Sequence, residues 1–231
     1  MSSRRPARLA IVTEGTSDFL VLRAVIRKAI PDAEVVPVHP EVPLGAYPEY
    51  HRAVGTAGRG TGWRGVKAWC EDYRETLQFF MRAVVGDEYD ALVIHVDASM
   101  ADKVGAERQC PPARATTDAL RDVVLRDWLR HPDAPWFLAF ATPSKSTDAW
   151  VVAALRIPAR DLECEKGVEA MLCRRRYLRR KDGRVVKPRS RYEPLANRVA
   201  KHLALVRKRC TEADRFLSDL GKLIALESRD S

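Results

Sequence analysis

The chain has 231 residues, of which 46% are hydrophobic and 31% charged, and its formal net charge is +9. This length and composition predict a globular protein with one domain of about 150 residues and a substantial extension. No apolar run approaches the ~18 residues that a membrane-spanning helix needs, and the first residues lack the apolar segment of a signal peptide. We therefore expect a soluble cytoplasmic protein that has no membrane partner.

The positive charge is concentrated in the last third of the chain. Residues 1–150 contain 19 Lys and Arg against 20 Asp and Glu, whereas residues 151–231 contain 21 against 11. A polyanion such as nucleic acid is the natural partner for the second of these segments.

Five cysteines are spread widely through the chain: Cys70, Cys110, Cys164, Cys173 and Cys210. None belongs to a Cys-x-x-Cys pair, and their odd number does not suggest a disulfide framework. We therefore expect reduced thiols.

The chain begins with the pattern of a strand, a tight turn and a helix. Residues 9–12 form a short apolar run that predicts a buried strand, and Thr16 or Ser17 can cap a helix whose apolar positions recur at helical spacing. Glu14 therefore lies at the carboxyl end of the first strand. Asp18 lies four residues later, in the first helical turn, and can point toward the same crevice.

Two later strands also lead to acids. Residues 91–96 end at Asp97, and residues 136–141 lead to a turn in which Ser146 can cap a helix that contains Asp148. Ligands of open α/β sheets bind at the carboxyl ends of the strands, so we expect these acids at one edge of the sheet. Clustered carboxylates are what a hard cation such as Mg²⁺ requires.

The segments between these strands complete an alternating pattern. A proline-containing run at 33–38 predicts an edge strand, and helices are expected at 63–84 and 116–129. The repeated order of strand and helix predicts an α/β fold with a mainly parallel sheet and helices on both faces. The glycine-rich segment 55–62 is either a phosphate cradle or a mobile connection, and residues 98–112 are expected to form a polar loop.

The pattern changes beyond Pro158. A short helix is expected at 168–172, and Asp182-Gly183 between two short apolar runs predicts a basic hairpin. Two amphipathic helices complete the chain. We therefore divide it into an α/β domain at residues 1–157 and a basic hairpin and helical extension at 158–231 that packs on this domain.

The hairpin region carries ten Lys and Arg against one acid, which exceeds ordinary surface usage and predicts contact with nucleic-acid phosphates. The ten candidates are Arg174, Arg175, Arg176, Arg179, Arg180, Lys181, Arg184, Lys187, Arg189 and Arg191. A solvated charged face is the alternative. Tyr177 and Tyr192 lie among these residues and could stack on bases or pack in the core.

Three motifs occur in a fixed order along the predicted strands. They are Glu-Gly-x-x-Asp at 14–18, Val96-Asp97-Ala98-Ser99 and Asp148-Ala149-Trp150. This set resembles the TOPRIM fold over residues 7–155, and it is most similar to the small TOPRIM proteins and OLD-type nucleases of prokaryotic anti-phage systems. The chain departs from the TOPRIM Asp-x-Asp pattern, because Ser99 stands in the place of the second acid.

The resemblance implies a two-metal site for Mg²⁺ or Mn²⁺. Its metal ligands would be Glu14, Asp18, Asp97, Ser99 and Asp148, and Glu14 and Asp97 would be catalytic. Lys145 is expected near these acids and is a further catalytic candidate. Glu14 would act as general base or acid. Among these residues, Asp148 could instead stabilise the start of its helix, and Lys145 could either neutralise a scissile phosphate or be a solvated turn lysine.

Two further residues have alternative interpretations. Asp102 could replace the missing second acid or be a solvated loop charge, and the latter is favoured. His95 lies within an apolar strand, where a core histidine is the expected role.

These features predict a Mg²⁺-dependent nuclease of DNA or RNA, and the resemblance implies a place in anti-phage defence. The main alternative is a catalytically degenerate TOPRIM subunit that binds nucleic acid or an ATPase partner as a sensor or scaffold, and Ser99 is its chief support. A small-molecule phosphohydrolase would use the same acids. A homo-oligomer is compatible with each of these functions.

Overall fold

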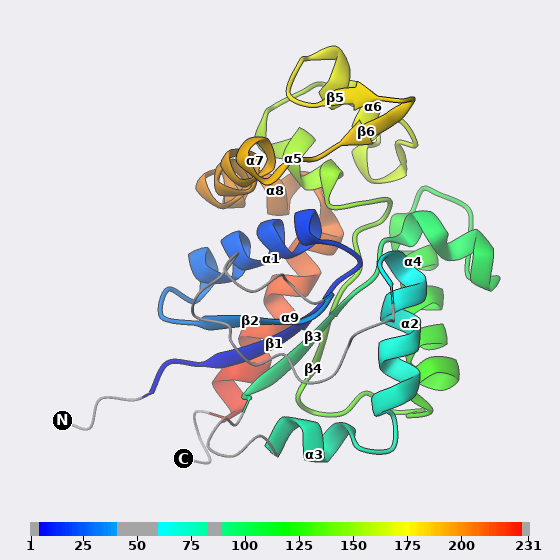
Figure 1. The fold of residues 1–231 in the computed structure, drawn as a ribbon, viewed down its shortest axis with the longest axis vertical. Coiled ribbons are helices and arrows are strands. Elements are labelled where there is room, and N and C mark those ends of the chain that lie inside the picture. The colour runs from blue at the N-terminus through cyan, green and yellow to red at the C-terminus, as the bar shows by residue number, and fades with distance from the viewer. Residues whose placement is uncertain (1–4, 41–59, 83–88, 228–231) are drawn as a thin grey trace.

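A four-stranded parallel sheet forms the centre of the computed structural model, which describes residues 5–40, 60–82 and 89–227 (Figure 1). The strands are β1 (Arg8–Val12), β2 (Glu34–His39), β3 (Ala91–His95) and β4 (Leu138–Ala141), in the spatial order β2-β1-β3-β4. Leu9 pairs with Val35 of β2 and with Ala91 of β3. The α/β class, the parallel sheet and the edge position of the proline-containing strand are confirmed.

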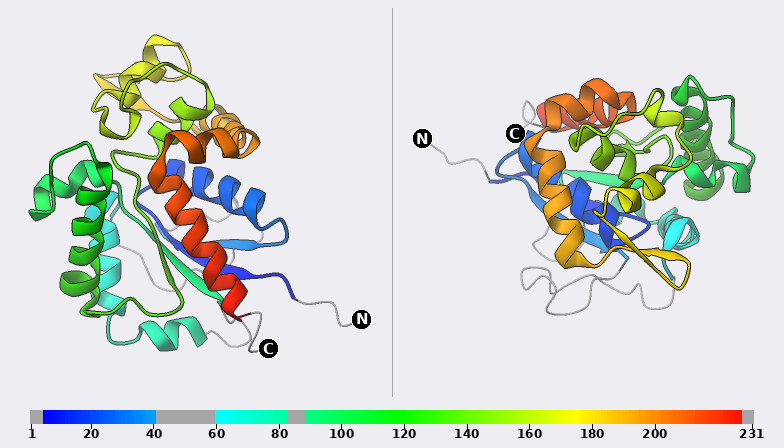
Figure 2. Two further views of the ribbon diagram at one scale, coloured as in Figure 1. Left: turned by 180° about the vertical axis from the view of Figure 1, so that it is seen from behind. Right: turned by 90° about the horizontal axis from the view of Figure 1, so that it is seen from above.

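Helices cover both faces of this sheet because the strand side chains alternate between them. Leu9 and Ile11 point to one face, which α1 (Thr16–Ala29), α5 (Asp148–Ala154) and α9 (Thr211–Glu227) cover. Figure 2 shows α9 crossing this face.

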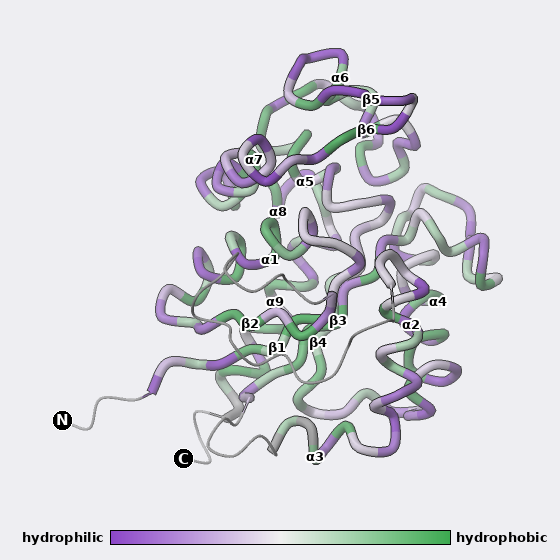
Figure 3. Tube along the Cα trace, viewed as in Figure 1, coloured by the Kyte–Doolittle hydropathy of each residue, from purple (hydrophilic) through white to green (hydrophobic). Residues whose placement is uncertain are grey.

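Ala10 and Val12 point to the other face, where they belong to a second apolar cluster. Residues of α2 (Gly62–Tyr73), α3 (Leu77–Arg82) and α4 (Ala113–Val123) pack there. Both faces of the sheet are therefore buried. Figure 3 shows hydrophobic residues along the strands.

The C-terminal segment, residues 158–231, adds mainly helices to the first apolar cluster. α6 (Val168–Arg174), α7 (Arg189–Lys201) and α8 (Leu203–Arg209) contribute buried apolar residues to it. β5 (Arg179–Lys181) and β6 (Arg184–Val186) form a separate antiparallel pair joined at Asp182 and Gly183. The C-terminal segment therefore shares a core with the sheet domain.

Several predicted boundaries differ from the structure. The helix expected at 63–84 is interrupted after α2, where the amide of Thr76 donates a hydrogen bond to the carbonyl of Tyr73, and α3 begins at Leu77. Residues 83–84 of that predicted helix, like residues 55–59 of the glycine-rich segment, lie outside the described residues. The expected polar loop contains the 3₁₀ helix η1 (Ala98–Val104).

The helical predictions near α4 and at the C-terminus were also incomplete. α4 begins three residues earlier than Thr116, directly after Pro112, and continues as the π-helical segment η2 (Val124–Leu129). Three C-terminal helices replace the two expected, because the first expected helix is interrupted at His202, where α7 ends and α8 begins.

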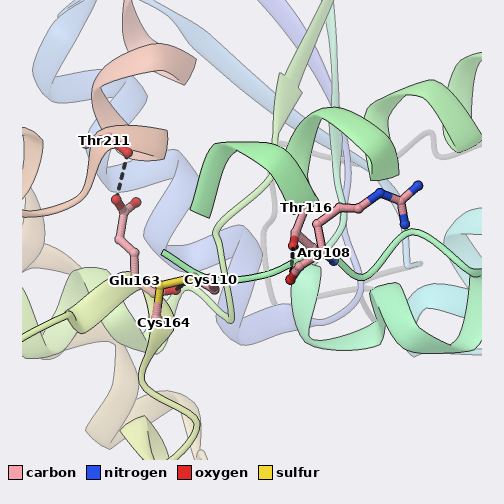
Figure 4. Close-up of a disulfide and its surroundings, with 6 residues drawn as sticks. All are labelled: Arg108, Cys110, Thr116, Glu163, Cys164 and Thr211. Carbon is pink, nitrogen blue, oxygen red and sulfur yellow. Dashed lines mark hydrogen bonds between the residues drawn. A yellow bond between two sulfur atoms is a disulfide. The ribbon is translucent and has the colours of Figure 1, made fainter. Parts of the chain in front are cut away.

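The expectation of five reduced thiols is wrong for two cysteines. Cys110 and Cys164 form a disulfide with a Cα–Cα distance of 5.6 Å. It links the loop before α4 to the short 3₁₀ helix η3 (Leu162–Cys164), and Figure 4 shows Glu163 beside it, in contact with Thr211 of α9. The two cysteines are 54 residues apart, and no sequence pattern indicates that they pair, because only the tertiary fold brings them together. Cys70, Cys173 and Cys210 are free.

The described helices differ from membrane spans in length or in composition. None of them combines the length and the apolar composition that crossing a bilayer requires.

Gly65 of α2 lies against the backbone of Gly60. This close approach leaves no room for a side chain at position 65. A Cβ at Gly65 would lie 2.6 Å from the carbonyl oxygen of Gly60, whereas a Cβ at Gly221 of α9 would meet nothing within 4 Å. We expect Gly65→Ala to lower the melting temperature. Gly221→Ala should raise stability by up to about 1 kcal/mol, because alanine favours a helix interior. Thermal unfolding of the two variants provides the measurement, and equal melting temperatures would contradict the prediction.

Candidate metal centre

Two acids meet at the carboxyl end of the sheet. Glu14 follows β1, Asp97 follows β3, and these two strands are paired in parallel. The backbone amide of Asp97 donates a hydrogen bond to Oε1 of Glu14 at 2.7 Å. The expected convergence of Glu14 and Asp97 at one edge is therefore observed.

Asp18, His95 and Asp97 form a compact group beside this contact. Each offers one ligand atom, and the three atoms lie within 4.8 Å of one another. His95 is the last residue of β3, and Asp18 lies in the first turn of α1. Thr147 donates a hydrogen bond from its hydroxyl to Oδ1 of Asp18 at 2.6 Å, which fixes the orientation of this carboxylate. This group could hold a metal ion.

Several polar atoms of the group have no hydrogen-bond partner. They are both ring nitrogens of the fully buried His95 and Oδ1 of Asp97. His95 Nε2 lies 3.1 Å from Asp97 Oδ1, so the two residues form an ion pair when the imidazole is protonated, although these atoms form no hydrogen bond. Buried polar atoms are usually paired, so atoms left open at a common point are suited to a ligand.

Burial and mutual charge shift the proton affinities of these residues. Burial, followed by the nearby Asp97 carboxylate, raises the pKa of Glu14 to about 8. Burial likewise raises the pKa of Asp97 to about 6, although the close His95 acts in the opposite direction. Burial opposes the charged form of His95, but Asp97 and Asp18 outweigh it and raise the pKa of His95 to about 9.

The protonation of His95 matters for metal binding. With a pKa of about 9, the imidazole carries a proton at neutral pH when no metal is bound, and this positive charge partly balances the acids. Binding of a cation through the ring would displace that proton, so metal binding and proton release are coupled.

Asp148 lies outside this three-residue group. Its carboxylate is fully buried, and Oδ1 accepts a hydrogen bond from the hydroxyl of Tyr192 at 2.7 Å. Oδ2 lies 2.6 Å from Nζ of Lys187, which also contacts Glu169 at 2.8 Å. Both oxygens of Asp148 are therefore occupied by residues of the C-terminal extension. Tyr192 is fully buried, so the structure supports its core-packing alternative and not base stacking.

Ser99 and Lys145 line a cleft that adjoins Asp97. The cleft has a volume of about 690 Å³. The amide of Ser99 donates to the carbonyl of Lys145, which joins the segments after β3 and β4. Ser99 is exposed, and Asp102, also at the cleft, pairs with Lys103 at 2.8 Å. Asp102 therefore acts as a solvated, paired acid, as expected.

The ten basic candidates divide into two kinds. Lys187 is half-buried and contacts two carboxylates, so it differs from the others. The remaining nine are exposed: Arg174, Arg175, Arg176, Arg179, Arg180, Lys181, Arg184, Arg189 and Arg191. Of these, Arg189 pairs with Glu193. We refer to the nine exposed residues as the basic ribbon.

Sequence reasoning missed two members of the site. His95 was expected to be a core residue, and Thr147 was not considered. His95 precedes Asp97 by two residues, and this spacing on a strand places both side chains on one side, which was a signal that could have been used. Thr147 had no such signal, because its contact with Asp18 spans 129 residues.

Comparison of the chain with protein-family models, curated proteins and solved structures found no match. The chemistry of the site must therefore be inferred from its own residues.

The raised pKa of Glu14 predicts a pH-dependent stability in the metal-free protein. A carboxyl group whose pKa is higher in the folded state stabilises the fold at low pH, and this contribution is lost as the pH rises from 4.5 through about 8. The raised pKa of His95 has the same effect, because its contribution to stability is lost as the pH rises from 6.5 through about 9. We expect the melting temperature in EDTA to fall between pH 6 and pH 9, and to fall less in Glu14→Gln.

Glu75→Gln serves as the control, since this carboxylate is largely exposed. It should retain the pH dependence of the wild-type protein. If the melting temperature fell equally in wild type and in Glu14→Gln over the same rise in pH, Glu14 would not be the source of the pH dependence.

Proposed function

We propose that this protein is a divalent-metal-dependent phosphodiesterase that acts on nucleic acid. The observation that carries the proposal is the group of Asp18, His95 and Asp97, whose ligand atoms converge at the carboxyl ends of parallel strands. A cleft adjoins Asp97, and basic residues line part of it. A candidate cation site beside a cleft that contains basic side chains suits a substrate with phosphate groups.

The donor set favours particular metals. Two carboxylates and one imidazole supply mixed oxygen and nitrogen ligands, which suit Mn²⁺ better than they suit Mg²⁺. Ser99 carries no charge, and both oxygens of Asp148 are occupied, so the residues support one ion rather than the two expected from sequence. A bound divalent ion would lower the pKa of a coordinated water and stabilise charge on the leaving oxygen.

The remaining residues have defined roles in this proposal. Asp18 is oriented by Thr147, and Asp97 is held beside Glu14 through its own amide. The pKa of Glu14 is about 8 in the metal-free protein, so its carboxyl group is mainly protonated at neutral pH. A bound cation would lower that pKa, and the carboxylate could then accept a proton from an attacking water. Lys145 lines the cleft, where its ammonium can contact a phosphate. The TOPRIM fold, a role in anti-phage defence and an ATPase partner stay predictions based on the resemblance. A homo-oligomer also stays a prediction.

A second candidate function is a binding subunit that does not hydrolyse its ligand. It is favoured by Ser99, which supplies no charge where the TOPRIM pattern has an acid, and by the pairing of Asp148 with Lys187. Such a subunit would keep the basic ribbon and the cleft. Measurements of cleavage and binding on the same preparations separate the two functions.

Substitution of Asp97 tests the metal chemistry. Asp97→Asn removes one ligand charge, so we expect it to abolish Mn²⁺ binding in calorimetry and cleavage of plasmid and RNA. The exposed Asp127→Asn is the control and should retain both. Cleavage by wild type in Mn²⁺ but not in EDTA supports the phosphodiesterase.

Ser99→Asp adds a charge near Asp97 and should increase cleavage supported by Mg²⁺. If wild type and Ser99→Asp both bind nucleic acid and neither cleaves it, the non-hydrolysing subunit replaces the phosphodiesterase.

The basic ribbon should govern general affinity. Replacing Arg174, Arg175, Arg176, Arg179 and Arg180 by alanine should weaken binding for all sequences alike, because phosphate contacts carry no sequence information. The slope of the logarithm of the binding constant against the logarithm of the salt concentration should become less negative. The expected change is about 0.9 for each duplex phosphate that the variant no longer neutralises. Fluorescence anisotropy at several salt concentrations provides the measurement.

A variant with Lys28→Ala and Arg126→Ala removes two exposed cations from other helices and is the control. Unchanged affinity in the ribbon variant at low salt would assign the ribbon to a solvated face.

A further inference from the structure

The cleft beside Asp97 is lined by four acids, Asp97, Asp102, Glu107 and Glu169, and by an equal number of basic residues. Four basic residues line it: Lys145, Lys166, Arg180 and Lys187. Lys187 contacts Asp148 and Glu169 at 2.6 and 2.8 Å. Among the described parts of the chain, the other three form no ion pair, although two of the acids that line the cleft, Asp102 and Glu169, are paired with lysines.

These three free cations come from different parts of the fold. Lys145 lies between β4 and α5, Lys166 lies between η3 and α6, and Arg180 is the central residue of β5. They therefore converge on the cleft only in the folded protein. The lining as a whole is charge-balanced, but three cations without an ion-pair partner leave separate contact points for the phosphate groups of one ligand.

Arg180 differs from its neighbours on β5 in the direction of its side chain. Successive side chains of a strand point to opposite faces, and Arg180 lines the cleft, whereas Arg179 and Lys181 are not among the lining residues. Arg180 is also paired across the hairpin with Val185, which packs against the apolar core. One strand thus presents Arg180 to the cleft and two cations to the outer surface.

The size of the cleft limits the form of the ligand. Its volume of about 690 Å³ is within the range of about 300–1,000 Å³ that is typical of small-molecule pockets. The side chains of His95 and Asp97 are only 0% and 15% exposed. Asp97 lines the cleft, so a phosphodiester group that enters the cleft can reach this residue. A cleft of this volume suits a few unpaired nucleotides better than both strands of a duplex.

We propose that the cleft binds single-stranded nucleic acid, with Lys145, Lys166 and Arg180 contacting its phosphates. The proposal rests on the proposed function for the identity of the polyanion. It assigns the outer residues of the basic ribbon to contacts that do not distinguish single strands from duplexes. Selection of single strands then belongs to the cleft.

The test is binding in EDTA, so that no cleavage occurs. Fluorescence anisotropy compares a labelled thymidine oligonucleotide with a closed hairpin duplex of equal charge. Wild type should bind the single strand about tenfold more tightly, which corresponds to about 1.4 kcal/mol. Lys166→Ala and Arg180→Ala should each remove most of this preference and flatten the single-strand salt slope by about 0.7.

Arg179→Ala is the matched control on the same strand. It should weaken single-strand and duplex binding by the same factor and leave the preference unchanged. Equal wild-type affinities for the two ligands, or equal effects of Arg179→Ala and Arg180→Ala on the preference, would overturn the proposal. Thymidine monophosphate that competes as well as the oligonucleotide would overturn it as well, because the cleft would then be a mononucleotide site.

Failure of this proposal is distinguishable from failure of the phosphodiesterase. A protein that selects single strands in EDTA but cleaves nothing in Mn²⁺ would retain the cleft assignment and lose the enzymatic one. A protein that cleaves nucleic acid in Mn²⁺ without preferring single strands would retain the enzymatic assignment and lose the cleft assignment.

Discussion

The parallel pairing of β1 with β3 is the constraint on which the candidate site depends. It places the residues that follow both strands at the same edge of the sheet, where the Asp97 amide can donate to the Glu14 carboxylate. Asp18 joins them because α1 begins immediately after Glu14 and Gly15. The backbone therefore compels carboxylates to lie together, although their charges repel one another in the absence of a cation.

His95 relieves part of that repulsion. The protonated imidazole is itself a buried cation among acids, and its raised pKa reflects their combined charge. The acids are therefore partly neutralised when no divalent ion is bound. A metal ion that binds His95 must displace the proton from the imidazole. Lys187 serves a similar purpose for Asp148, which would otherwise be a fully buried, uncompensated carboxylate.

Strand periodicity and the acids at strand ends were sufficient to predict the sheet, the parallel direction of its strands and the proximity of Glu14 to Asp97. These features follow from local patterns and from the geometry common to parallel sheets. Contacts between distant segments could not be predicted in the same way. Cys110 with Cys164, and Asp148 with Lys187 and Tyr192, depend on how the C-terminal helices pack, and this packing is determined by tertiary contacts rather than by local propensity.

The hydrogen bond from Thr147 to Asp18 has a consequence for folding. It closes a loop of 129 residues, and the contact between Asp97 and Glu14 closes one of 83. Contacts between such distant residues form late, because the entropy of closing a long loop opposes them until the sheet is assembled. A chain still emerging from the ribosome would thus have neither β4 nor the residue that orients Asp18. The complete group of Asp18, His95 and Asp97 is a property of the finished fold, and a cation bound there would selectively stabilise that state.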